Sequence, residues 1–213
     1  MRTNWEREQE YLHHHGISTF EVPMHILNWF STHVYKAKEE GELYTKQLAG
    51  HIRQEYNLYT QNPPDEVIAY LRTRCLEGPF RHQFDNIQMF TRNAPVACNT
   101  LWVNFQRKYE FNPLHIHSGF ASFILFIQIP YDLKKEEEYF GTEMNGDIHT
   151  SKLCFVNYHP HDGTPSYRPI NVDKSFEGKL ILFGAKHIHQ VYPFYTSDDY
   201  RITVSGNLKF DVN

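Results

Sequence analysis

The sequence has few of the residues that mark a disulfide-rich or membrane-spanning protein. Its 213 residues include three widely spaced cysteines and no CxxC pair, the cysteines being Cys75, Cys98 and Cys154. An odd, scattered set predicts reduced thiols in a cytoplasmic protein. The longest apolar run, Phe120–Ile129, is interrupted by Ser122 and Gln128 and is too short to span a membrane. The charged start, Met1–Glu10, has no apolar signal region, so we expect a soluble protein without membrane association.

Positive charge is also scarce. Lys and Arg number 21 against 25 Asp and Glu, giving a net charge of −4 with His neutral. That balance argues against general binding to nucleic acids, because such binding depends on neutralising phosphates. Apolar residues make up 40% of the chain, which is typical of a globular domain, and the 16 Phe and 14 Tyr favour strands and aromatic-lined pockets.

The first third of the chain has helical periodicity. Apolar residues recur at helical spacing in Pro23–Lys38 and again in Asp65–Leu76, where the Gly and Pro at positions 78 and 79 predict a stop. The polar segment Glu42–Tyr56 is predicted as a third helix. We expect residues 1–99 to form a mainly helical part that packs on the core.

From residue 100 onward the pattern changes to short β-branched and aromatic runs separated by turn residues. This order predicts an α+β fold, with a double-stranded β-helix (jelly roll) core over residues 100–213 and one structural domain overall. Tyr131–Thr150 is predicted as a mobile insert over one barrel mouth. The expected strands are Leu101–Phe105, Ala121–Ile129, Lys152–Tyr158, Lys179–Phe183 and Arg201–Leu208.

Histidine is abundant, with 14 residues and four His-x-His pairs. The first pair, at 13 and 15, lies in a polar segment and suggests a solvated face. The third, at 159 and 161, surrounds a Pro and precedes Asp-Gly, which is typical of a loop. His115 and His117 precede an apolar strand, and residues two apart on a strand share a face, so both imidazoles can reach one metal. Hydrogen-bonded surface histidines are the alternative.

His189 follows the strand that ends at Phe183 and a glycine turn, and it is the third candidate ligand. His187 would share its face, so the sequence leaves the choice between them open. Further along, Arg201 and Thr203 share a face of the last strand. A guanidinium and a hydroxyl in a pocket would hold a carboxylate, although an exposed strand arginine is the simpler interpretation.

Taken together, these stretches resemble the iron(II)- and 2-oxoglutarate-dependent oxygenase superfamily, and particularly the prolyl-4-hydroxylase-like oxygenases common in phage genomes. The resemblance extends from Leu101 to Leu208. It is carried by residues 102–104, 112–119, 122–130, 178–183, 189–193 and 201–207.

The resemblance implies a jelly roll with one iron ion inside a barrel mouth. Its His-x-Asp/Glu…His pattern falls on His115, position 117 and His189, with His117 standing where the family has a carboxylate. Its basic residue for 2-oxoglutarate falls on Arg201, with Thr203 as partner and Asn104 facing the same cosubstrate. The implied activity is hydroxylation of a small-molecule or peptide substrate with O₂, giving succinate and CO₂, in the cytoplasm of a cell or of a virus-infected host.

Two other functions fit the same residues. A three-histidine cupin-type dioxygenase would bind metal without 2-oxoglutarate, and would not need Arg201 at the barrel end. A jelly-roll binding module would bind zinc or no metal and catalyse nothing. Metal content and 2-oxoglutarate binding distinguish these two from the oxygenase.

Overall fold

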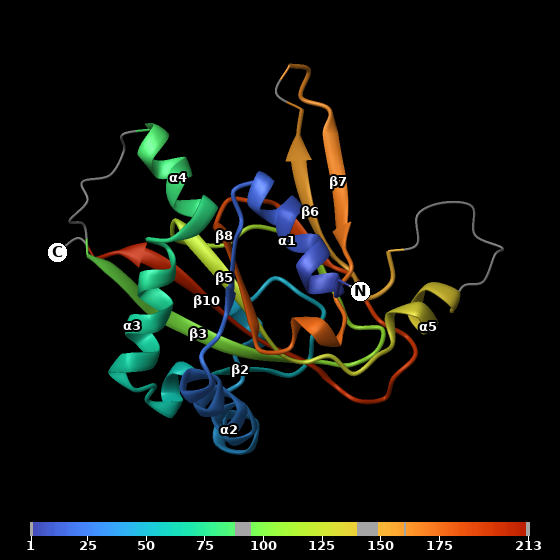
Figure 1. Ribbon diagram of the computed structural model, residues 1–213. Helices are drawn as coiled ribbons and strands as arrows, with labels where there is room; N and C mark the ends of the chain where they lie inside the picture. Colours follow the sequence, from blue (N-terminus) through green and yellow to red (C-terminus); the bar gives the residue numbers. More distant parts are fainter. Residues whose placement is uncertain (1, 88–94, 140–148, 160, 212–213) are drawn as a thin grey trace.

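Two antiparallel β-sheets form the centre of the computed structural model, which describes residues 2–87, 95–139, 149–159 and 161–211 (Figure 1). The larger sheet has the order β1-β8-β5-β10-β3-β2, and the smaller has β4-β9-β6-β7. The strands are β1 Ser18–Glu21, β2 Glu55–Asn57, β3 Val96–Gln106, β4 Asn112–His115, β5 Ala121–Gln128, β6 Leu153–Tyr158, β7 Pro165–Ile170, β8 Lys179–Gly184, β9 His189–Val191 and β10 Arg201–Phe210.

The apolar core has two layers because the central strands are buried on both faces. On β5, Ile124 and Phe126 point between the sheets, where they pack with Phe155 of β6. The alternate residues Phe123 and Leu125 point to the opposite face, which the N-terminal helices cover. This alternation explains why β5 has a continuous apolar sequence. The expected α+β fold with a jelly-roll core and N-terminal helices is confirmed.

The helices pack through the apolar stripes that their sequences predict. α2 follows Pro23 and buries its stripe, including Phe30 and Val34, against the larger sheet. α1 begins with a capping box in which Thr3 and Glu6 bond each other's backbone N–H groups. The helices are α1 Asn4–His14, α2 Met24–Glu40, α3 Asp65–Arg74, α4 Gly78–Ile87 and α5 Leu133–Glu138, with 3₁₀ turns at Thr45–Gln47, Tyr59–Gln61 and Lys174–Phe176.

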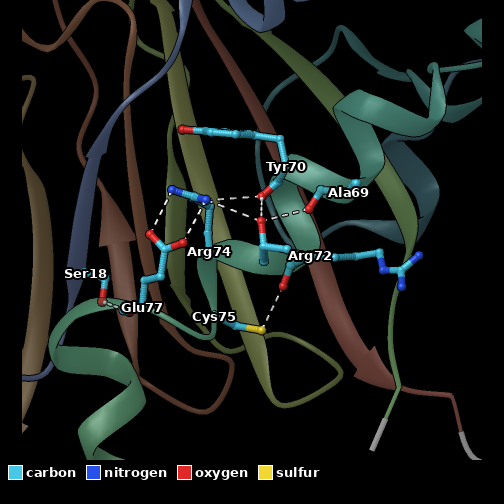
Figure 2. Close-up of polar contacts among 8 residues, drawn as sticks. Ser18, Ala69, Tyr70, Arg72, Arg74, Cys75 and Glu77 are labelled. Atoms are coloured by element: carbon cyan, nitrogen blue, oxygen red, sulfur yellow. Dashed lines mark hydrogen bonds and ion pairs between the residues drawn. The ribbon is translucent and has the colours of Figure 1, made fainter. Parts of the chain in front are cut away.

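The end of α3 is tied to the sheet by a small polar network (Figure 2). Arg74 donates to both carboxylate oxygens of Glu77, each at 3.0 Å. The carbonyl of Glu77 accepts from the hydroxyl of Ser18 on β1 at 3.1 Å, and that hydroxyl accepts from the backbone N–H of Phe80 at 3.0 Å. The expected stop of the helix before Gly78 is correct, but a further helix, α4, begins at Gly78 itself.

The prediction of a helix over Glu42–Tyr56 is wrong. The segment contains only the turn Thr45–Gln47 and then β2, which pairs with β3. Its backbone groups are satisfied in other ways, since Tyr44 N donates to Glu55 O and Phe105 N donates to Gln54 O. A polar segment without helical periodicity can become an edge strand when a partner strand supplies its hydrogen bonds.

The expected insert Tyr131–Thr150 contains α5, and residues 140–148 lie outside the described residues. Glu136 of α5 is fully buried and accepts hydrogen bonds from Tyr195 N and from the N–H and hydroxyl groups of Thr196. α5 is thereby attached to the chain between β9 and β10. The three cysteines are free, as predicted, and all three are buried. Within the described part of the chain, no helix has the length and apolarity needed to cross a bilayer.

Candidate metal centre

Three histidine side chains come together at the smaller sheet, next to the paired strands β4 and β9. β4 pairs with β9 so that His115 lies directly opposite His189, and His117 follows β4 with its N–H bonded to Ala185 O at 2.7 Å. One ring nitrogen from each of the three lies within 4.8 Å of the others. Ile116, between the first two, is 50% exposed and points away. The alternation expected from His-x-His thus brings both imidazoles to one side.

Backbone carbonyls determine which ring nitrogens carry protons. His115 Nδ1 lies 2.7 Å from Pro113 O, and His189 Nδ1 lies 2.9 Å from His187 O. Since a carbonyl oxygen only accepts, each Nδ1 carries the hydrogen and each Nε2 keeps a free lone pair. Metal-bound histidines are usually oriented by a second hydrogen bond of this kind.

The nitrogen positions fit a metal ion. His117 Nε2 and His189 Nε2 are 3.2 Å apart. For metal–nitrogen bonds of about 2.1 Å, that separation corresponds to an angle of roughly 100° at the metal, within the range for cis ligands. Burial lowers the pKa of all three imidazoles, that of His117 to about 3, so all three are neutral at physiological pH as metal ligation requires.

The other histidines lie elsewhere. His187 Nε2 lies 3.0 Å from Asn157 Oδ1, and His187 does not belong to the cluster of three imidazoles. The geometry therefore favours His189 over His187 as the third metal ligand. His13 contacts Thr19 at the surface, and His159 faces Asp162 in the β6–β7 turn.

No carboxylate of the described residues joins the three imidazoles. Asp132 accepts from Lys135 N and so caps α5, while Asp162 accepts from Thr164 N in the β6–β7 turn. Both carboxylates therefore have local structural roles and do not join the imidazoles.

A cavity of about 50 Å³ opens beside the three histidines, between the two sheets. Its opposite wall is formed by polar residues of β3 and β10 that pair in register, Arg201 with Gln106 and Thr203 with Asn104. The remaining lining residues are Ile52, Trp102, Asn112, Ile124, Phe126, Leu153, Val172, Val191 and Ser205.

Arg201 in this wall is a buried cation, 3% exposed. All its partners are neutral oxygens, although a buried charge is normally paired with an opposite charge. The ion pairs found among the described residues do not include Arg201. An anionic ligand in the cavity would supply the missing negative charge. The hydrogen-bond partners of the Arg201 guanidinium are Gln106 Oε1, Tyr131 Oη, Ser151 O and Tyr192 O.

Thr203 and Asn104 lie side by side on the same wall. Asn104 Nδ2 donates to Thr203 Oγ1 at 3.1 Å, while Asn104 Oδ1 is buried without a hydrogen-bond partner. The two residues that the sequence associates with the cosubstrate are therefore in the cavity with Arg201. Gln106, Tyr131, Ser151 and Tyr192, which surround the guanidinium, were not predicted from the sequence.

Residues 100–207, slightly more than half of the chain, match the family model described as "Putative 2OG-Fe(II) oxygenase". The chain belongs to this family of 2OG-Fe(II) oxygenases. Fe(II) and 2-oxoglutarate are therefore its cofactors. The site fits both cofactors, because the neutral imidazoles suit a divalent metal ion and the unpaired cation of Arg201 suits a carboxylate of 2-oxoglutarate.

Solved structures share the fold of this 2OG-Fe(II) oxygenase. A prolyl-4-hydroxylase from Pseudomonas putida aligns over 97% of this chain and 99% of its own, with 13% identity and a TM-score of 0.57. HygX from Streptomyces hygroscopicus, solved with nickel, 2-oxoglutarate and hygromycin B bound, aligns over 96% and 87%, with 13% identity and a TM-score of 0.50. No curated protein matches the sequence.

Proposed function

We propose that this oxygenase hydroxylates a C–H bond of a small molecule or peptide, with His115, His117 and His189 as iron ligands. Arg201 and Thr203 hold the distal carboxylate of 2-oxoglutarate, with Asn104 beside them. One observation carries the proposal: three neutral imidazoles and a buried, charge-unpaired guanidinium line the same cavity. A metal and a dicarboxylate can bridge these two groups.

When bound, Fe(II), 2-oxoglutarate and O₂ supply the oxidation, in which one oxygen atom enters the substrate and the other enters succinate as CO₂ leaves. The side chains of this protein position these groups and exclude water. Arg201 would hold the distal carboxylate of the cosubstrate, and the imidazoles would hold the iron that binds its other end. Apolar side chains, including Phe126, Leu153 and Val191, line the same cavity.

The third imidazole changes the charge of the centre. His117 stands where the family resemblance places a carboxylate, so the iron site is one unit more positive than a two-histidine, one-carboxylate site. Arg201 adds another positive charge across the cavity. We expect the site to bind the 2-oxoglutarate dianion tightly, and iron in this site to have a raised reduction potential.

Prolyl residues in peptides are the first substrate class to test, because the Pseudomonas putida prolyl-4-hydroxylase aligns with almost the whole of both chains. Small polar molecules are the second, since HygX was solved with hygromycin B bound.

The test begins with metal-free protein reloaded anaerobically with Fe(II), whose metal content and 2-oxoglutarate affinity are measured. Succinate formation is then followed with O₂ and each candidate substrate, with anaerobic samples and His115→Ala as controls. Substrate-dependent succinate and an added oxygen atom in the product are expected. Iron binding without 2-oxoglutarate binding would indicate a three-histidine cupin-type dioxygenase. Failure to bind Fe(II) would indicate a non-catalytic module.

A further inference from the structure

Every N–H group of the Arg201 guanidinium already has an acceptor. Gln106 Oε1 takes two of them, from Nε at 3.0 Å and from Nη2 at 2.6 Å. The other Nη2 hydrogen goes to Tyr192 O, and Nη1 donates to Ser151 O and Tyr131 Oη. Because arginine has five N–H groups, a cosubstrate carboxylate can bind only by sharing or displacing one of these partners.

Only one of these partners, Gln106, lines the cavity. Tyr192 and Ser151 contribute main-chain carbonyls, and the hydroxyl of Tyr131 is itself tied to Ser151 O at 3.1 Å. Gln106 lies opposite Arg201 in the β3–β10 register, and it bonds the guanidinium through its side chain. The cavity side of the guanidinium is therefore the side that Gln106 covers.

The amide of Gln106 imitates half of a carboxylate. One planar sp² oxygen accepts from two N–H groups of the same fork, as a carboxylate oxygen does, but the amide carries no charge. A carboxylate bonds a guanidinium more strongly than an amide does. An anion that reaches Arg201 should consequently replace the amide.

We propose that Gln106 occupies the place of the distal carboxylate in the cosubstrate-free protein, and that 2-oxoglutarate displaces its amide. Residue 106 thereby determines cosubstrate affinity. This inference rests on the proposed role of Arg201. Gln106 Nε2 also donates to Glu110 O at 2.5 Å, so a rotation of the side chain can release Arg201 while the amide keeps a partner.

Calorimetric titration of 2-oxoglutarate into anaerobic Fe(II)-loaded protein tests the inference. Gln106→Leu removes the competing oxygen and should tighten 2-oxoglutarate binding about tenfold, the size expected for hydrogen bonds to a charged group. Gln106→Glu supplies a permanent carboxylate to Arg201 and should weaken binding at least about 100-fold. Iron affinity should stay as in wild type, because the imidazoles lie across the cavity.

Two controls locate the effect. Gln128 on β5 donates to Tyr200 O and is not among the hydrogen-bond partners of Arg201, so Gln128→Leu and Gln128→Glu should bind 2-oxoglutarate as wild type does. Pyruvate has the 2-oxo acid end of the cosubstrate but no distal carboxylate. Its binding should differ by less than about twofold between wild type and Gln106→Leu.

Three results would overturn the inference. If Gln106→Leu binds 2-oxoglutarate no more tightly than wild type while Arg201→Ala binds it weakly, Gln106 supports Arg201 instead of competing for it. If pyruvate binding tightens as much as 2-oxoglutarate binding, Gln106 acts at another place. If Arg201→Ala binds 2-oxoglutarate as well as wild type, the proposed role of Arg201 fails and the inference fails with it.

Discussion

Glu55 is a buried carboxyl group next to the cosubstrate wall. It lies on β2 directly opposite Asn104, is 1% exposed, and has one oxygen without a hydrogen-bond partner. Burial, with a smaller contribution from the charge of Glu110, raises the pKa of Glu55 from 4.5 to about 8. The group is therefore neutral in the folded protein at pH 7 and ionised in the unfolded chain. Its neutrality keeps a second anion away from the place proposed for 2-oxoglutarate.

This difference in pKa makes the free energy of unfolding depend on pH. Between the unfolded pKa and the folded pKa, the folded state binds more protons at Glu55 than the unfolded state. Stability therefore falls as the pH rises, by about 1.4 kcal/mol per pH unit and by about 5 kcal/mol in all. Glu55→Gln removes this titration. The variant should match wild type near pH 4.5 and exceed it in stability by that amount above pH 8.

Urea denaturation of metal-free protein at a series of pH values from 4.5 to 9 would measure the effect. The difference in free energy of unfolding between Glu55→Gln and wild type should grow steadily with pH. Glu42→Gln, at an exposed position of the same segment, is the matched control and should show no such growth. A difference that stays constant over the whole range would refute the argument that Glu55 is held neutral by burial.

Three further changes test the metal site, the cosubstrate site and α5. His117→Ala should weaken Fe(II) binding at least about 100-fold, because losing a metal ligand should cost more than the 10- to 100-fold effect of losing a residue that only hydrogen-bonds to a ligand. His117→Asp should keep iron. Equal Fe(II) isotherms for the alanine variant and wild type would show that His117 is not a ligand. Arg201→Ala should weaken 2-oxoglutarate binding by about 2–5 kcal/mol in calorimetry and leave Fe(II) binding nearly intact. Glu136→Ala should lower the stability by about 3 kcal/mol and the melting temperature by roughly 6–12 °C, because it removes the hydrogen bonds that the buried Glu136 carboxylate accepts from Tyr195 and Thr196. Glu138→Ala, at an exposed position of α5, is its control, and equal melting temperatures for the two variants would contradict the anchoring role of Glu136.

The sequence alone determined the elements whose periodicity is strong. α2, α3 and β5 follow directly from apolar spacing, because a helix or strand that buries one or both faces must repeat apolar residues at its own period. Glu42–Tyr56 and α4 were not predictable in this way. The first is polar and depends on hydrogen bonds from β3, and the second begins at a glycine that is equally typical of a helix end.

At the site, the sequence supplied residue types and spacing, but the tertiary structure decided which of them meet. The His115–His117 spacing predicts a shared face, whereas the preference for His189 over His187 depends on the pairing of β9 with β4. Arg201 is visible in the sequence, but its surroundings are not. Two of its acceptors are the main-chain carbonyls of Ser151 and Tyr192. Every residue has such a carbonyl, so only the folded chain determines which carbonyls face the guanidinium.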